Sequence, residues 1–218
     1  KRKNLDFSKL INSRDTTTHK VANYNLEYFT ELILALPMDT VEKHYQSLQD
    51  VIDKLGMNNI DVHQLTLLKG SELDTAQQRK QFEMQTMFRV FVGCLGLYKI
   101  GDEDVPCAEI EEVVQSTDTL TFEDFIECRI MDLLVKVYLD HDPYLEIFAL
   151  IEKLDLSPFN VLRILKERFL YNYDSLTELI EFYIQGIKTP LFNGHDEIKK
   201  FVKNNIHGYI SGEYGKNE

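Results

Sequence analysis

The chain has 218 residues, and its hydrophobic content of 44% is sufficient for a buried core of ordinary size. Its 36 acidic and 24 basic residues give a formal charge of -12, which disfavours binding to nucleic acid and to anionic lipid headgroups. Three widely spaced cysteines without a CxxC pair predict neither a disulfide framework nor a zinc site. Because no apolar run approaches the roughly 20 residues of a membrane span, we expect a cytoplasmic protein.

The first clear elements are a strand, a helix and a second strand. Residues 28–36 read YFTELILAL, a short apolar run that predicts a buried strand. The capping box DTVE at 39–42 and apolar residues at helical spacing predict a helix over 40–55, and a second strand is predicted over 60–68. This order is typical of a parallel βαβ unit. Since two parallel strands do not bury both faces of a sheet, we expect the unit to belong to a larger barrel or doubly wound sheet.

Glu31 lies inside the first predicted strand. An ionised carboxylate among apolar residues is costly unless it has hydrogen-bond donors or reaches water. Glu31 is therefore expected either to point into a polar cavity or to lie at the edge of the strand, and the sequence leaves both alternatives open.

The rest of the chain changes in character near residue 119. Residues 71–118 are polar and mixed, with one predicted strand at 87–92 and several glycines. A helix is predicted from 121 to the His-Asp-Pro sequence at 141–143. Its buried stripe is predicted to contain Phe122, Phe125, Ile126, Arg129, Ile130, Leu133, Leu134 and Val137. Further helices are predicted at about 144–154, 158–171, 175–187 and 196–206.

These elements predict an α/β fold followed by an all-α region. We expect three consecutive domains. Residues 1–70 would hold the last strands of a partial (β/α) barrel, 71–118 a mixed connector with short strands, and 119–218 a helical domain.

Motifs for common enzyme chemistry are not found in the sequence. The six histidines show neither HExxH nor HxH spacing, and there is no GxSxG, P-loop or GxGxxG. Two His-Asp pairs, at 141–142 and 195–196, are similar to those of helical metal-dependent phosphohydrolases, but helix capping explains both. We therefore predict no metal site, and no catalytic residue is identified from the residue pattern alone.

Three segments taken together resemble radical SAM enzymes of the branch that often carries a cobalamin-binding domain. In that family an RKN-like turn precedes the fifth barrel strand, a sequence like ELILGLPGET runs from that strand into its helix, and the sixth strand ends in a sequence like QLLLLPGTEL. The matching segments here are RKN at 2–4, ELILALPMDT at 31–40 and QLTLLKGSEL at 64–73. The similarity continues through TMFRV at 86–90, GLY at 96–98, EIEEVV at 109–114 and FEDFIECR at 122–129, and so covers about residues 1 to 130.

The sequence departs from the family pattern in several places. Ala35 and Met38 replace the usual glycines of GLPGET, and Lys69 stands where proline is common. The CxxxCxxC motif that holds the four-iron four-sulfur cluster is not in this sequence, and neither are the first four barrel strands nor a cobalamin domain. We therefore expect this chain to be inactive as an isolated fragment.

The resemblance implies a parent enzyme that cleaves S-adenosylmethionine reductively, with a four-iron four-sulfur cluster and with cobalamin as a further cofactor that the branch allows. It implies that Glu31 and Gln64 bind the cofactor and that Arg89 and Tyr98 contact an unidentified substrate. The alternative is that these four residues have ordinary structural roles.

The implied partner of this chain is the N-terminal half of the same parent protein, and an exposed strand edge near 29–36 predicts self-association of the isolated chain. The rival function is a non-catalytic helical protein-interaction module.

Overall fold

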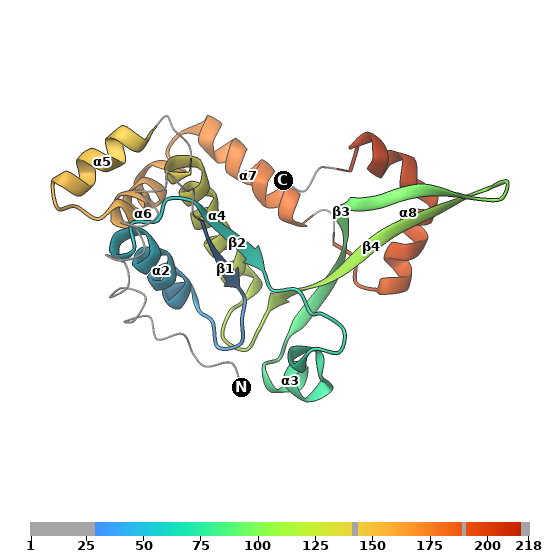
Figure 1. Ribbon diagram of the computed structural model, residues 1–218. Coiled ribbons are helices and arrows are strands. Elements are labelled where there is room, and N and C mark those ends of the chain that lie inside the picture. Colours follow the sequence, from blue (N-terminus) through green and yellow to red (C-terminus); the bar gives the residue numbers. More distant parts are fainter. Residues whose placement is uncertain (1–28, 141–143, 189–190, 215–218) are drawn as a thin grey trace, which may run out of the picture. The chain divides into compact units, whose positions relative to one another are not determined.

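The computed structural model describes residues 29–140, 144–188 and 191–214, apart from the side chain of Val92. The RKN segment at 2–4 lies outside the described residues. The described chain is a mixed α/β structure, with strands early in the sequence and helices at its end (Figure 1). The elements are β1 Thr30–Leu34, α2 Val41–Gln49, the π-helical turn η1 Asp50–Lys54, β2 Ile60–Gln64, the 3-10 turn η2 Glu72–Asp74, α3 Ala76–Gln81, β3 Gln85–Ile100, β4 Glu103–Ser116, α4 Phe122–Leu139, α5 Leu145–Lys153, α6 Pro158–Phe169, α7 Asp174–Lys188 and α8 His195–Ser211.

The described residues form two compact units, each built from several stretches of chain. The first unit contains the residues up to Leu34, Thr40–His63 and Glu127–Thr177, and the second contains Ala35–Asp39, Gln64–Ile126 and Glu178 onward. The sequence predicted consecutive domains divided after residues 70 and 118. The units differ from these domains because β2 and α4 each run from one unit into the other. None of the helices in the described residues has the length and apolar character to cross a membrane.

The first unit contains the predicted βαβ arrangement. β1 and β2 are hydrogen-bonded neighbours and their arrows run in the same direction in Figure 1, which confirms a parallel pair joined by α2. The helix begins one residue later than the capping box implies, because Thr40 rather than Asp39 is the N-cap and accepts a hydrogen bond from the N–H of Lys43 at 3.2 Å. The side chains that form the core of this unit include Leu48, Ile52, Ile60, Met131, Phe159 and Leu162.

The predicted second strand is too long. β2 ends at Gln64 rather than at 68, because the chain then pairs with β4 instead of β1. The N–H of Leu67 donates to the carbonyl of Glu112 at 2.8 Å, and the N–H of Val114 donates to the carbonyl of Leu65 at 2.9 Å. Residues 65–67 therefore lie along the free edge of β4 in the second unit.

A long antiparallel hairpin dominates the second unit. β3 has 16 residues and β4 has 14, whereas the sequence predicted only short strands in this region and did not predict β4 at all. The strands join through the two residues between Ile100 and Glu103, where Gly101 has a φ of 65°. Pro106 and the five acidic residues of β4 hide the alternation that normally indicates a strand.

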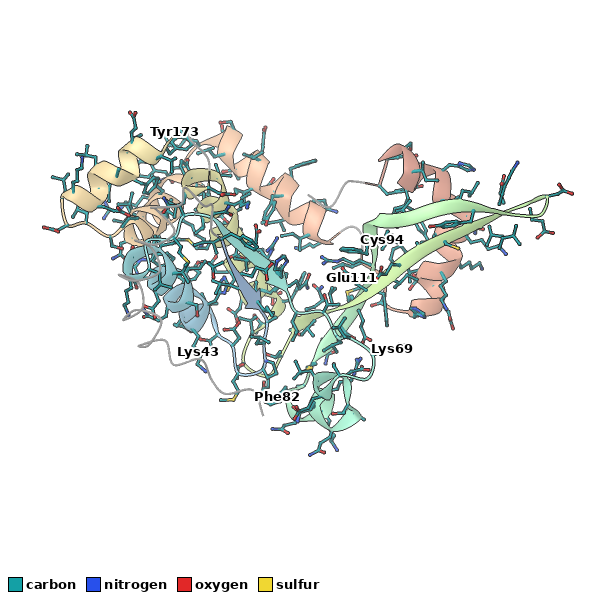
Figure 2. The ribbon with its side chains drawn as sticks, viewed as in Figure 1. Lys43, Lys69, Phe82, Cys94, Glu111 and Tyr173 are labelled. Atoms are coloured by element: carbon teal, nitrogen blue, oxygen red, sulfur yellow. The ribbon has the colours of Figure 1, made fainter. Side chains whose placement is uncertain are left out.

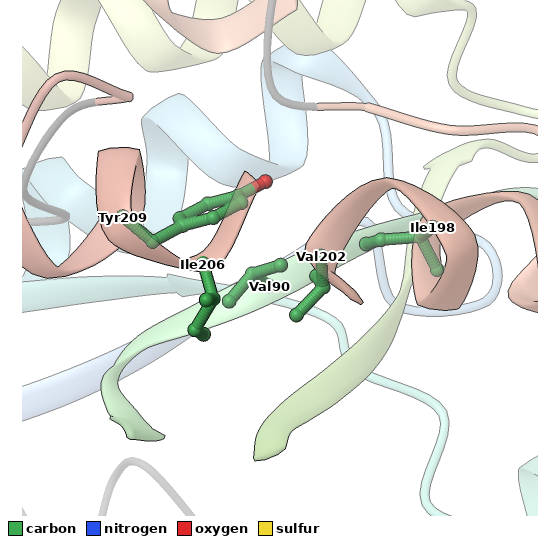
Figure 3. Close-up of a cluster of buried hydrophobic side chains, with 5 residues drawn as sticks. All are labelled: Val90, Ile198, Val202, Ile206 and Tyr209. Carbon is green, nitrogen blue, oxygen red and sulfur yellow. The ribbon is translucent and has the colours of Figure 1, made fainter. Parts of the chain in front are cut away.

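Helix α8 packs on one face of this hairpin. Val90 of β3 contacts a stripe of buried side chains from the helix, which Figure 3 shows facing the strand. The last segment of the predicted helical domain at 119–218 is a helix, but the apolar stripe of α8 is buried against a sheet. The stripe consists of Ile198, Val202, Ile206 and Tyr209.

The buried stripe of α4 agrees with the prediction in part. Phe125 is buried as expected, but Val137 is 40% exposed and Arg129 and Leu133 are only partly buried. The side chains that fill the core are Phe125, Cys128, Ile130, Met131, Leu134, Val135 and Leu139. The predicted stripe is therefore confirmed at Phe125, Ile130 and Leu134, and the observed buried face extends to residues that it did not include, such as Met131 and Val135.

Candidate functional site

The loop at 35–39 follows the carboxyl end of β1, and parallel α/β sheets bind ligands beyond this end of their strands. Ala35 has a φ of 71° and Met38 a φ of 67°, both in the left-handed region that favours glycine. Asp39 holds the loop closed, since its carboxylate accepts a hydrogen bond from the N–H of Ala35 at 3.2 Å. The hydroxyl of Thr119 donates to the carbonyl of Asp39 at 2.7 Å. The chain keeps a tight turn here although two of its residues carry side chains.

Gln64, at the carboxyl end of β2, lies in a hydrogen-bonded group with Arg89 and Glu111, which we call the Arg89 cluster. The amide nitrogen of Gln64 donates to the carbonyl of Val114 at 2.9 Å, and its oxygen accepts from Nη1 of Arg89 at 3.3 Å. Arg89 in turn donates through Nε to Oε2 of Glu111 at 2.9 Å. The structure thus brings together Gln64 and Arg89, which the family resemblance had assigned separately to cofactor and substrate.

The Arg89 cluster lies on the hairpin face opposite to α8. Arg89 and Glu111 are directly opposite each other in the β3–β4 register, as are the neighbouring Val90 and Ile110. Because side chains alternate between the two faces of a strand, Val90 and Ile110 pack against α8 while Arg89 and Glu111 face away from it. Figure 2 labels Glu111 on β4.

A second ion-pair group fixes the base of the hairpin. Nη1 and Nη2 of Arg79 donate to the two carboxylate oxygens of Glu112 at 2.5 and 2.9 Å, and Nη2 also donates to Asp74 at 2.6 Å. The hydroxyl of Thr86 donates to Glu112 at 2.7 Å. The hydrogen bonds from Arg79, followed by that from Thr86, hold the pKa of the Glu112 carboxyl below its ordinary value. This bidentate clamp fixes the segment that precedes β3 against β4.

Gln115 occupies a β-bulge beside these residues. Gln85 is opposite Ser116 and Thr86 is opposite Val114, so Gln115 is the additional residue on β4. Its side chain is 5% exposed, and neither its amide nitrogen nor its amide oxygen has a hydrogen-bond partner among the described residues. A buried polar group in this state costs about 1 to 3 kcal/mol.

Glu31, for which the sequence left a polar cavity and the strand edge as alternatives, is exposed to solvent on β1. Its side chain is 59% exposed, so the expected cost of burying a carboxylate does not arise, and its charged neighbour is His63, with 3.6 Å between Glu31 Oε1 and His63 Nε2. Glu31 lies on the face of β1 opposite to the buried Leu34, so its side chain does not point into the helices. It does not share a face with Gln64, because His63 and Gln64 are consecutive on β2 and therefore point to opposite faces.

Tyr98 lies far along the hairpin from Arg89. It is opposite Val105 near the turn and is 59% exposed. Nine residues of extended chain separate it from Arg89, a span of about 30 Å. The structure therefore does not bring together these two predicted substrate contacts.

The polar side chains buried in the first unit are better explained as links between helices. Nε2 of His44 on α2 lies 2.7 Å from Oδ1 of Asp132 on α4, and both residues are more than nine-tenths buried. Glu127 accepts hydrogen bonds from the hydroxyl of Tyr45 at 3.0 Å and from the ammonium of Lys166. Burial and then the Glu127 charge raise the pKa of the Tyr45 hydroxyl above its ordinary value.

Sequence reasoning missed Glu111 and Gln115 as site residues. Glu111 was noticed only within the EIEEVV segment of the family resemblance, and Gln115 carries no motif. The signal that was available is the alternation of Glu109, Glu111 and Val113 with Ile110, which becomes informative only once β4 is recognised as a strand.

No three His, Cys, Asp or Glu side chains in the described ranges come together in a way that could hold a metal ion. Cys94 and Cys107 are exposed on the hairpin, and Cys128 is buried in α4. Comparison of the chain with protein-family models and with curated proteins gave no match.

Proposed function

We propose that this chain is the C-terminal part of a radical SAM enzyme, in which it shapes or caps the site for S-adenosylmethionine-dependent radical chemistry on an unidentified substrate. The observation that carries the proposal is the backbone at Ala35 and Met38. These are the two positions at which the family sequence GLPGET has glycine, and both residues here have a positive φ. Two independent residues in glycine-like conformations support a shared loop geometry better than sequence similarity alone does.

The open face of the small sheet also supports the proposal. Leu34 and Ile60 are buried, at 0% and 2% exposure, whereas Ile33 on the alternate face of β1 is 45% exposed. The side chains of Glu31 and His63 are each 59% exposed. Parallel strands are usually covered on both faces, so a bare face is expected where further barrel strands would close over it. The partial (β/α) barrel therefore remains part of the proposal.

The described cysteines do not fit a four-iron four-sulfur cluster. Such a cluster needs thiolates that converge on it, whereas one cysteine is buried in a helix and the other two are exposed on the hairpin. The proposal therefore assigns the cluster, and any cobalamin, to the N-terminal half of the parent polypeptide. Within this chain, the Arg89 cluster and the loop at 35–39 would position S-adenosylmethionine or substrate by hydrogen bonds.

The natural reading frame provides the test. The polypeptide encoded from its own start codon should contain CxxxCxxC, turn brown on anaerobic reconstitution with iron and sulfide, and release 5′-deoxyadenosine from S-adenosylmethionine under reducing conditions. Serine replacements of those three cysteines are the matched control. A reading frame without the cysteine motif, or a reconstituted protein that binds no stoichiometric iron, would contradict the proposal.

One observation favours the rival function, a helical protein-interaction module. Helix α5 exposes aliphatic side chains that ordinarily lie in a core, among them Ile147 at 55%, Leu150 at 57% and Leu154 just beyond its end at 61%. Under the radical SAM proposal the exposed aliphatic side chains of α5 are a secondary feature. If the upstream reading frame encodes an unrelated domain, the exposed surface of α5 becomes the leading candidate for function.

A further inference from the structure

The Arg89–Glu111 pair has donors and an acceptor that no other described residue uses. A guanidinium has five N–H groups. In the described part of the chain Arg89 uses only Nε, to Glu111, and Nη1, to Gln64. Its Nη2 group donates to no acceptor there, and Oε1 of Glu111 accepts no hydrogen bond there. The two side chains are 27% and 18% exposed, so a small ligand can reach both.

Gln64 and the hairpin hold this pair in a fixed orientation. Gln64 is fixed by its bond to the carbonyl of Val114, and its oxygen then accepts from Arg89. Arg89 and Glu111 sit opposite each other on paired strands, so both Cα atoms are part of the same ladder. A donor and an acceptor that are already oriented lose little conformational entropy when they bind a ligand.

The charge of the pair decides which class of ligand fits. An anion about 4 Å from Arg89 would lie about 6 Å from Glu111, and because Coulomb energy varies as 1/r, repulsion would cancel roughly two-thirds of the attraction. The chain's formal charge of -12 opposes anion binding further. A neutral ligand is not repelled. A hydroxyl group both donates and accepts, so two adjacent hydroxyls match the Nη2 donors and the Glu111 acceptor together.

We propose that the Arg89 cluster binds vicinal hydroxyl groups of a sugar ring. This inference rests on the proposed function, since it assigns the ligand class of the same site. Two sources supply this chemistry: the ribose of an adenosyl cofactor and the ring of a carbohydrate substrate. The alternative is an ordinary cross-strand ion pair that binds nothing.

The test is an NMR titration of the full purified chain, observed at the Nε–H of Arg89 and the side-chain amide of Gln64. The probes are methyl β-D-ribofuranoside, methyl α-D-glucopyranoside, the 2-deoxy analogue of each, and inorganic phosphate. We expect a saturable shift with one of the two parent glycosides, with a dissociation constant on the order of 1 mM. Loss of the 2-hydroxyl should weaken binding by about tenfold, because Glu111 is left without its donor. The riboside responding alone identifies the cofactor ribose as the source, and the glucoside responding alone identifies a carbohydrate substrate.

Three single substitutions distinguish a loss of glycoside binding from a loss of folded structure. Glu111→Gln should weaken glycoside binding by about tenfold or more, because an uncharged amide is a weaker acceptor. Arg89→Lys keeps the charge and the cross-strand pair but loses the forked donors, so the shift of the Gln64 side-chain amide, which this variant still has, should disappear while the chain stays folded. The matched control is Arg163→Gln, which removes a similar exposed pair with Glu167 on α6, 3.7 Å apart, and should leave the titration unchanged.

Three results would overturn the inference: no saturable shift with either glycoside, phosphate binding as tightly as the glycosides, or full binding retained in Arg89→Lys. The failure of the proposed function is read separately, from the cysteine motif and iron content of the natural polypeptide. Glycoside binding without a cluster would leave this inference standing and remove the radical chemistry, whereas a cluster without glycoside binding would do the reverse.

Discussion

Replacing Met38 with glycine should stabilise the chain. An L-residue in the left-handed region costs about 1 to 2 kcal/mol, and glycine relieves this strain. The replacement also increases the entropy of the unfolded chain, which costs about 0.4 to 1 kcal/mol. Because the Met38 side chain is 59% exposed, little packing is lost. The net expected gain in the free energy of unfolding is about 0.8 kcal/mol.

The matched control is Leu68→Gly, which lies in the same unit, is 67% exposed and has no positive φ. Its free energy of unfolding should fall by about 0.4 to 1 kcal/mol, because glycine increases the entropy of the unfolded chain and relieves no strain at this position. Urea unfolding followed by circular dichroism gives both values, provided that the slope against denaturant is the same for the variants. If Met38→Gly destabilises the chain as much as Leu68→Gly does, the loop is not strained at this position and the main support for the radical SAM proposal is lost.

Three further predictions concern the core, the hairpin base and Glu31. Ile198→Ala should lower the free energy of unfolding by about 2 to 5 kcal/mol because the side chain is fully buried against the hairpin, whereas Ile210→Ala, 52% exposed on the same helix, should change it by less than about 0.5 kcal/mol in the same urea assay. Arg79 lowers the pKa of the Glu112 carboxyl in the folded state, so the contribution of Glu112 to stability is present above its unfolded pKa and is lost as the pH falls through its folded pKa. Glu112→Gln should therefore reduce the loss of stability between neutral and acidic pH. An unchanged pH profile of stability would show that the ion pair with Arg79 contributes nothing. Glu31→Gln should leave the thermal midpoint almost unchanged, since the side chain is exposed, and a large drop would show that Glu31 has structural partners.

Local signals predicted much of the helical structure. The spacing of apolar residues and the capping sequences placed the helices from α4 to α7 within a few residues of their observed ends, whereas α8 ends at Ser211, five residues beyond its predicted end. Ser157, for example, caps α6 by accepting from the N–H of Asn160 at 3.0 Å, with Pro158 in the first turn, and α6 begins at the predicted residue 158. These features depend only on neighbouring residues, so they can be recognised without tertiary information.

Non-local pairing accounts for the errors. The length of β2 depends on whether residues 65–67 bond to β1 or to β4, and nothing within that segment records the choice. The burial of α8 depends on β3, about 110 residues earlier, which supplies the apolar surface on which it packs. The sequence left open whether Glu31 points into a polar cavity or lies at the strand edge, because the exposure of its face of the sheet depends on the fold.

The candidate site was predicted in part. Gln64 and Arg89 were identified through the family resemblance, but their contact with each other depends on the hairpin register that pairs Arg89 with Glu111. A register is a property of two strands, and β4 was not predicted. Tyr98 was associated with Arg89 by the order of the motifs, and the extended hairpin separates them.

The second unit contains several features that oppose its own stability. Ala35 and Met38, two of the three non-glycine residues with a positive φ among the described residues of this unit, and the amide of Gln115, which has no partner in the described part of the chain, together cost about 3 to 7 kcal/mol. The whole stability of a typical domain is about 5 to 15 kcal/mol, so these costs are a large share of what its core must supply. A sequence selected for stability alone would have glycine at 35 and 38 and an apolar residue at 115, changes that single substitutions can make. Under the radical SAM proposal, the strained backbone at 35 and 38 is retained because the shape of that loop, rather than its own stability, is what a cofactor site needs.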